Sequence, residues 1–185
     1  MRMLTAASSI LQELERTLQG VRPDEIAALA ERVASSQAIF VAGAGRSGFM
    51  MRAFAMRLMH MGFRAYVVGE TVTPGIAADD LLVVGSGSGE TQTLVAMAAK
   101  AKSLGAVVAV LTVVPESTLG RLASDRVVVP AATKDGAAGT AASGQPMGSL
   151  FEQTLLLLLD TIIMHLMERK ALEGAAMFSN HANLE

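Results

Sequence analysis

Cysteine is absent from the 185 residues of this sequence. Disulfides, thiolate metal sites and a cysteine nucleophile are therefore excluded. Charged residues are also scarce, at 17%, and they form no basic block, with a formal net charge of −2. This composition argues against nucleic-acid binding, which depends on neutralising the phosphate backbone with lysine and arginine.

The sequence also predicts neither a signal peptide nor a membrane-spanning helix. Residues 1–5 lack the long apolar stretch of a signal peptide. The most apolar segment, the leucines 155–159 and their continuation to Met164, is interrupted by Asp160. It is judged too short and too charged to span a bilayer. We therefore expect a cytoplasmic, soluble protein with no membrane partner.

Hydrophobic residues nonetheless make up 51% of the chain, which allows a large core. The few charges would not cover the surface of a monomer, so part of the apolar excess is expected in subunit interfaces. The length fits one domain, here residues 1–185. The long apolar helix expected near the C-terminus is predicted to pack between subunits.

Apolar periodicity predicts alternating helices and strands. Helical spacing covers residues 4–18, 26–33, 47–61, 90–104, 117–122 and 149–172. Short apolar runs predict five buried strands at 38–42, 64–68, 81–84, 107–111 and 126–129. Together they predict an α/β fold with one doubly wound, five-stranded parallel sheet flanked by helices. In such sheets ligands bind at the carboxyl ends of the strands, so the loops after the first and third strands are the candidate sites.

Both of those loops are rich in glycine and hydroxyl groups. The first is Gly-Ala-Gly-Arg-Ser-Gly at 43–48, and the second is Gly-Ser-Gly-Ser-Gly-Glu-Thr at 85–91. Each opens a predicted helix, whose N-terminus offers unpaired amides and a positive dipole end. The hydroxyls of Ser47, Ser86, Ser88 and Thr91, with the backbone at Gly87, suit a phosphate monoester. The alternative is that Ser47 and one hydroxyl of the second loop only cap helices.

A dinucleotide site is a rival interpretation of the first loop. Its Gly-x-Gly-x-x-Gly pattern, with Glu70 just past the second strand, resembles a nucleotide-binding fingerprint. That reading leaves little chain for a substrate domain and does not explain the hydroxyls of the second loop. Phosphate binding by both loops is the favoured interpretation.

Three motifs resemble a known family. The segment 86–91, Ser-Gly-Ser-Gly-Glu-Thr, resembles the signature of sugar isomerase (SIS) domains. The segment 145–153, Gln-Pro-Met-Gly-Ser-Leu-Phe-Glu-Gln, and the ending His-Ala-Asn-Leu-Glu at 181–185 resemble a narrower group, the 6-phospho-3-hexuloisomerases. The resemblance covers essentially the whole chain. It departs at Asn180, where Arg is expected.

The resemblance implies a fold and a reaction. It implies a single SIS domain, a flavodoxin-like three-layer sandwich, with N-terminal helices and a C-terminal interface helix and tail. The implied reaction converts D-arabino-hex-3-ulose 6-phosphate to fructose 6-phosphate, in the ribulose monophosphate pathway of formaldehyde fixation. It further implies a homotetramer without a metal or other cofactor. Isomerisation of another phosphosugar, and a non-catalytic sugar-phosphate sensor, remain as alternatives.

Glu152 is the candidate base for this reaction. Moving a carbonyl from C3 to C2 through a cis-enediol needs one carboxylate that takes a proton and returns it. By pattern alone, Ser149 to Glu152 indicates a capping box, in which the glutamate only bonds the amide of the N-cap residue. The family resemblance favours the base.

The remaining candidates are basic. The resemblance suggests that His181 reaches an active site, its own or that of a neighbouring subunit, and helps open the sugar ring or shuttle protons. From the residues alone, His181 lies in a polar tail expected to be disordered. Arg46 is expected to contact sugar hydroxyls or phosphate, or else to be a solvent-exposed charge. His60 and His165 are interpreted as packing or interface residues.

Overall fold

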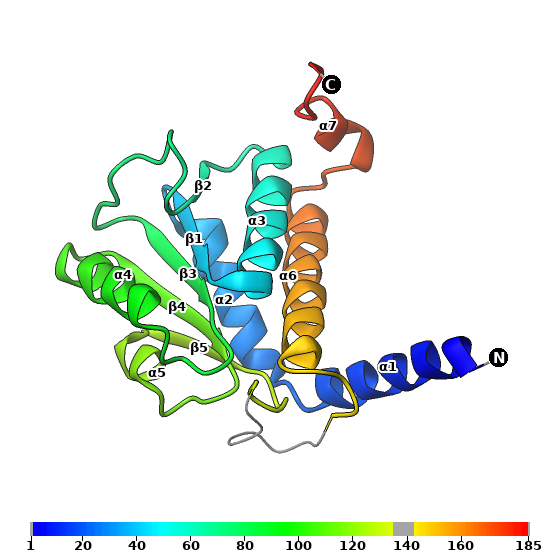
Figure 1. The fold of residues 1–185 in the computed structure, drawn as a ribbon. Helices are drawn as coiled ribbons and strands as arrows, with labels where there is room; N and C mark the ends of the chain where they lie inside the picture. Colours follow the sequence, from blue (N-terminus) through cyan, green and yellow to red (C-terminus); the bar gives the residue numbers. More distant parts are fainter. Residues whose placement is uncertain (1, 135–142, 185) are drawn as a thin grey trace.

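A computed structural model describes residues 2–134 and 143–184 of the chain. Five parallel strands form one sheet in the order β2-β1-β3-β4-β5 (Figure 1). The strands are β1 Ile39–Gly43, β2 Ala65–Val67, β3 Leu81–Gly85, β4 Val107–Thr112 and β5 Asp125–Val128. This is the predicted doubly wound sheet, and each strand lies within two residues of its predicted position.

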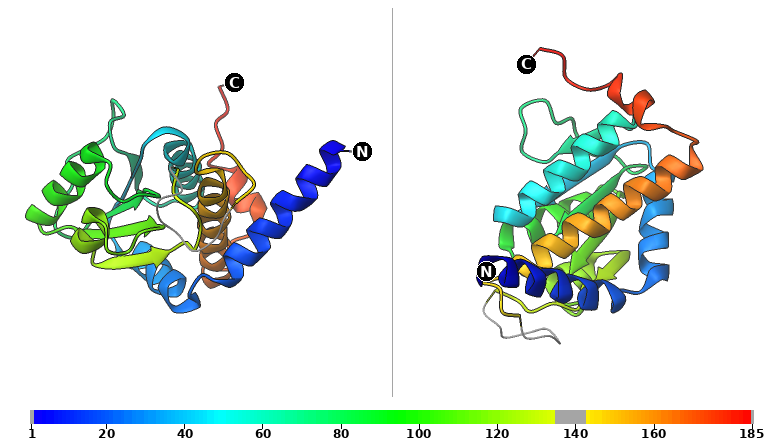
Figure 2. Two further views of the ribbon diagram at one scale, coloured as in Figure 1. Left: turned by 60° about the horizontal axis from the view of Figure 1, so that its bottom comes forward. Right: turned by 90° about the vertical axis from the view of Figure 1, so that its right-hand side faces the viewer.

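Helices cover both faces of the sheet and give three layers (Figures 1 and 2). One face carries α2 Pro23–Ser35, α3 Gly45–His60 and α6 Ser149–Arg169, and the other carries α4 Gln92–Ser103 and α5 Thr118–Leu122. Two further helices lie at the periphery, α1 Arg2–Gln19 and the unpredicted α7 Gly174–Phe178.

Alternate residues of each central strand enter two separate cores. In β3, Leu81 and Val83 pack under α3 and α6, whereas Leu82 and Val84 pack under α4. Side chains of a strand point to opposite faces in turn. Because both faces are covered, every residue of β3 is buried, as its continuous apolar run predicted.

The leucine run of α6 is explained by burial. The apolar run 155–164 that was judged too short to span a bilayer belongs to this helix of 21 residues, whose most apolar 18-residue window has a mean hydropathy of 1.5, so that α6 is by length and composition apolar enough to cross a membrane. However, 56% of its most apolar window is buried inside the chain, where Leu155, Leu159 and Ile162 are fully enclosed. Burial of each such side chain contributes about 2 kcal/mol. The helix also contacts α1, α2 and α3, which makes it the central member of its layer.

The start of α4 differs from the prediction. The helix begins at Gln92, and Glu90 lies in the preceding loop rather than in the first helical turn. Glu90 instead accepts a hydrogen bond of 2.7 Å from the amide of Thr118, the first residue of α5. Hydrogen bonds from Thr118 hold the pKa of Glu90 below its ordinary value. The carboxylate thus stabilises the start of α5.

Glycines bring α3 into contact with β1. A Cβ on Gly48 would lie 2.6 Å from the carbonyl oxygen of Gly43, and a Cβ on Gly43 would lie 2.9 Å from Gly48 Cα. Gly45 starts the helix with a φ of +56°, a conformation that only glycine adopts without strain. Of the three glycines that resembled a nucleotide fingerprint, Gly43 and Gly48 therefore have a packing role and Gly45 a conformational one. Glu70, the other part of that pattern, forms an ion pair with Arg52.

We predict that Gly48→Ala destabilises the fold. Alanine favours a helix by about 1 kcal/mol over glycine, but the clash with a rigid backbone oxygen outweighs this gain. The expected net loss is about 1–3 kcal/mol in the free energy of unfolding. Urea denaturation measures it, with Gly75→Ala as the control, because a Cβ on Gly75 meets nothing within 4 Å. Equal stability of the two variants would contradict the packing role.

Candidate active site

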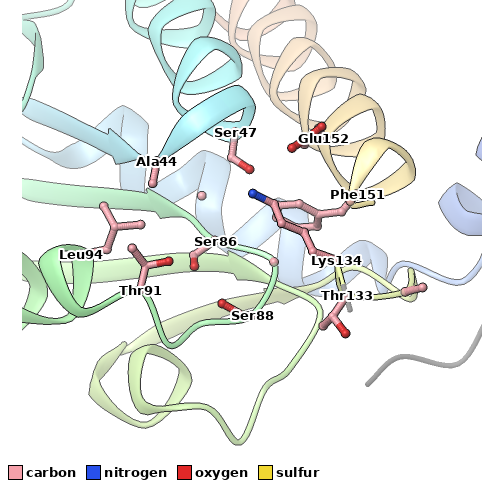
Figure 3. A pocket seen from close by; sticks show the side chains of 14 residues that line it. Ala44, Ser47, Ser86, Ser88, Thr91, Leu94, Thr133, Lys134, Phe151 and Glu152 are labelled. Atoms are coloured by element: carbon pink, nitrogen blue, oxygen red, sulfur yellow. The ribbon is translucent and has the colours of Figure 1, made fainter. Parts of the chain in front are cut away.

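A pocket of about 250 Å³ opens at the carboxyl ends of β1 and β3. These neighbouring strands lead into loops that run to opposite faces of the sheet, which is the topological switch point of the fold. The described residues that line the pocket include Ser47, Ser86, Gly87, Ser88, Thr91, Thr133, Lys134, Gly148, Phe151 and Glu152 (Figure 3). All of the predicted phosphate-binding residues except Arg46 therefore lie together with Glu152.

The hydroxyl groups of this pocket are not helix caps. The N-cap residues of α3 and α4 are Ala44 and Thr91, and neither makes a side-chain capping bond. The Ser86 hydroxyl accepts a hydrogen bond of 3.2 Å from the Gly89 amide, within the loop. Within the described part of the chain, the hydroxyls of Ser47 and Thr91 form no hydrogen bond. These groups can donate to an anion, and the N-termini of α3 and α4 add a positive potential.

Glu152 is the buried carboxylate of the pocket. Its side chain is only 5% exposed, and Oε2 lies 3.2 Å from Arg46 Nε. Arg46 also donates a hydrogen bond of 2.9 Å to the Ser149 hydroxyl, which in turn donates to the carbonyl of Pro146. Among the described residues, Oε1 of Glu152 has no hydrogen-bond partner. One carboxylate oxygen is therefore held in place while the other is available to a ligand.

The capping box is not formed. The N-cap of α6 is Gly148, so Ser149 is already the first helical residue and its hydroxyl turns back to Pro146. Glu152 pairs with Arg46 instead of an amide of its own helix. The alternative interpretation of Glu152 as a cap is therefore wrong for this structure.

Comparison with known proteins identifies the fold's family. The SIS domain family model matches residues 33–157. The chain belongs to the SIS-domain family. Within it, a Bacillus subtilis protein named 3-hexulose-6-phosphate isomerase is 52% identical over 178 residues, covering 96% of each chain. A Mycobacterium gastri protein of the same name is 43% identical, over 96% of this chain and 89% of that one.

A solved structure supports the same assignment. A Methanococcus jannaschii protein, whose structure is described as inferring a 3-hexulose-6-phosphate isomerase function, superposes with a TM-score of 0.82. It is 31% identical to this chain, and the match covers both chains completely. The predicted resemblance to 6-phospho-3-hexuloisomerases is thereby confirmed.

Lys134 and Phe151 belong to this SIS-domain site but were not predicted. Lys134 follows β5 in the segment between the predicted strand 126–129 and the predicted helix 149–172, part of which (135–142) lies outside the described residues. Figure 3 shows its amino group extending into the pocket. The Phe151 ring lies against Gly87, where an added Cβ would come within 3.3 Å of it.

His181 does not reach the pocket of its own chain. It stacks on His60, with ring centroids 5.4 Å apart, and Asn180 donates a hydrogen bond of 3.0 Å to the His60 carbonyl. Ser47 and His60 lie near opposite ends of α3, so the two places are about 20 Å apart at the rise of an α-helix. Burial, followed by the charges of Arg57 and His181, lowers the pKa of His60.

Helix α1 fixes the segment that leads into α6. The Glu13 carboxylate accepts hydrogen bonds from the Ser143 hydroxyl at 2.6 Å, the Gly144 amide at 2.9 Å and the Gln145 side chain at 3.0 Å. These bonds lower the pKa of Glu13 below its ordinary value. Gly148 and Glu152, which line the pocket, lie only a few residues further along the chain. By binding residues 143–145, α1 therefore helps to position one wall of the pocket.

We predict a pH-dependent effect of Glu13→Gln. A lowered folded-state pKa means that this carboxylate stabilises the fold above its ordinary value of 4.5, and that the stabilisation is lost as pH falls through the lowered pKa. The variant should therefore be less stable by about 1 kcal/mol at pH 7, with a smaller difference near pH 4. Thermal unfolding at both pH values measures it, with Glu15→Gln on the same helix as the control. A difference that is independent of pH would contradict the role of the ionised carboxylate.

Proposed function

We propose that this chain is a 6-phospho-3-hexuloisomerase, which converts D-arabino-hex-3-ulose 6-phosphate to fructose 6-phosphate through a cis-enediol. The observation that carries the proposal is the position of the buried Glu152 carboxylate in the same pocket as the hydroxyl-rich loop. The names of relatives at 52% and 43% identity support the same substrate. The reaction belongs to the ribulose monophosphate pathway, and we propose a cytoplasmic location for it.

The phosphate is proposed to bind at Ser47 and the 86–91 loop. Four hydroxyl-bearing residues of this region line the pocket together with Gly87, and one of them, Thr91, is the N-cap residue of α4. Each hydrogen bond to a charged group contributes about 1.5–3 kcal/mol. Four or five such bonds hold a dianion without requiring a lysine or arginine at this end.

The reaction is proposed to take place at Glu152. Its Oε1 removes the proton from C2 of the substrate and returns it to C3, on one face of the enediol. Arg46 binds Oε2 and Ser149, and so orients the carboxylate for both transfers. A direct contact of Arg46 with the sugar or the phosphate stays a prediction, in addition to this role in orienting the carboxylate.

A homotetramer is proposed to complete the site. Residues 1–185 would form one SIS unit, in which α1, the outer side of α6 and the tail provide the subunit contacts. Large apolar side chains are exposed on all three: Leu4 and Leu11 of α1, Met164 of α6 and Phe178 of α7. Because His181 lies far from its own pocket, its catalytic role requires the pocket of a neighbouring subunit.

A turnover assay tests the function. The wild-type protein should produce fructose 6-phosphate from hexulose 6-phosphate, and Glu152→Gln should lower kcat by about 10²- to 10⁴-fold. The variant should still bind fructose 6-phosphate, because glutamine preserves the shape of the side chain. Glu168→Gln, an exposed position on the same helix, is the matched control. Binding without turnover by the wild type would indicate a sensor, and near-normal kcat in Glu152→Gln would remove the base assignment.

Mixed oligomers test the placement of His181. We predict that His181→Ala and Glu152→Gln are each strongly impaired alone, while oligomers assembled from both chains recover part of the activity. Recovery follows because some pockets then combine an intact Glu152 with an intact partner histidine. Activity is measured after co-expression and purification through two different tags. Full activity of His181→Ala alone, or no recovery on mixing, would contradict a role across subunits.

A further inference from the structure

Lys134 brings a positive charge to the reacting end of the pocket. Its side chain passes over Gly148, where an added Cβ would lie 3.2 Å from Lys134 Cγ and 3.8 Å from Cε. The same point is 4.0 Å from Glu152 Oε1. The lysine chain and the carboxylate therefore flank one glycine, and both line the pocket.

This charge has no protein partner in the described part of the chain. Arg46, the other cation at the site, is held by Glu152 at 3.2 Å and by Ser149 at 2.9 Å. Lys134 forms no ion pair with a described acidic residue, although Glu152 is near. Its ammonium group is free to donate hydrogen bonds to a ligand in the pocket.

The side of the pocket on which Lys134 lies determines which part of a bound ligand this lysine contacts. The phosphate is assigned to the loop 86–91 and the N-termini of α3 and α4. Lys134 lies instead with Gly148 and Glu152, at the beginning of α6. A cation beside the base faces the carbons between which the proton moves.

We propose that Lys134 is a catalytic residue that stabilises the enediolate oxygen, an inference that rests on the proposed isomerase function. When Glu152 takes the C2 proton, the C–H electron pair forms the C2–C3 double bond and the C3 carbonyl pair moves onto oxygen. The ammonium group donates a hydrogen bond to this oxyanion. The oxyanion on C3 then gains one proton, and the C2 hydroxyl loses one as its oxygen becomes the new carbonyl. Protonated Glu152 returns its proton to C3. The product therefore has the same atoms and the same charge as the substrate.

Lys134→Met and Lys134→Arg test this role. Loss of a donor at a developing oxyanion lowers kcat by about 10²- to 10³-fold, whereas uniform binding would change KM alone. We expect this loss for Lys134→Met with KM nearly unchanged, and partial activity for Lys134→Arg, which keeps the charge. Lys100→Met, an exposed lysine of α4, is the matched control and should behave as wild type.

Two inhibitors separate the oxyanion from the phosphate. A phosphorylated sugar hydroxamate, which mimics the enediolate, should bind Lys134→Met more weakly by a factor close to the loss in kcat. Inorganic phosphate should inhibit the variant and wild type equally. Unchanged kcat, or weaker inhibition by inorganic phosphate with a raised KM, would overturn the proposal while leaving the isomerase function intact. A wild-type protein without turnover would overturn both.

Discussion

The ion pair between Arg46 and Glu152 joins the two segments from which the pocket is built. Arg46 lies in the first turn of α3, after β1, and Glu152 lies in the first turn of α6, more than 100 residues later. Withdrawing a carboxylate from water costs several kcal/mol, which a single exposed partner offsets only in part. Arg46 is 58% exposed, so the pair is a weak source of stability. The pair fixes the orientation of a carboxylate whose other oxygen has no hydrogen-bond partner among the described residues, and this is the oxygen to which we assign the proton transfer.

The rest of the fold makes that orientation reproducible. Leu155 and Leu159 hold α6 in the core, and the contact of Gly43 with Gly48 holds α3 against β1. The interiors of proteins are close-packed, so neither helix can slide without opening cavities. Glu152 and Ser47 thus lie in the first turns of two fixed helices, while the hydroxyls of Ser86, Ser88 and Thr91 lie on a short loop between β3 and α4.

The sequence predicted the sheet well because its strands are buried on both faces. A run such as Leu81 to Val84 has only one stable environment, the middle of a covered sheet. Site residues on the strand-end loops were predicted for the same reason, since the topology alone brings the ends of β1 and β3 together. Local sequence patterns gave a wrong prediction where long-range contacts determine the structure. Ser149 suggested a cap, but Met147 has a φ of +55° and the helix starts one residue earlier than a capping box requires.

The position of Lys134 in the pocket also could not be predicted from the local sequence. No local pattern distinguishes it from a solvent-exposed lysine, because its place beside Gly148 depends on how the segment after β5 meets the start of α6. His181 is a further case: its tail motif is recognisable, yet its position beside His60 follows from tertiary packing at the far end of α3.

The division of charge in the pocket agrees with the needs of an isomerase. The phosphate is the same in substrate, intermediate and product, so interactions with it bind all three equally and do not lower the barrier between them. Neutral hydroxyls and helix N-termini are sufficient for that task. The oxygens at C2 and C3 are different, because negative charge develops there only during the reaction. A fixed cation is most effective at this place. In the proposed mechanism, residues 86–91 therefore hold the molecule, whereas Glu152 and Lys134 distinguish the transition state from the ground state.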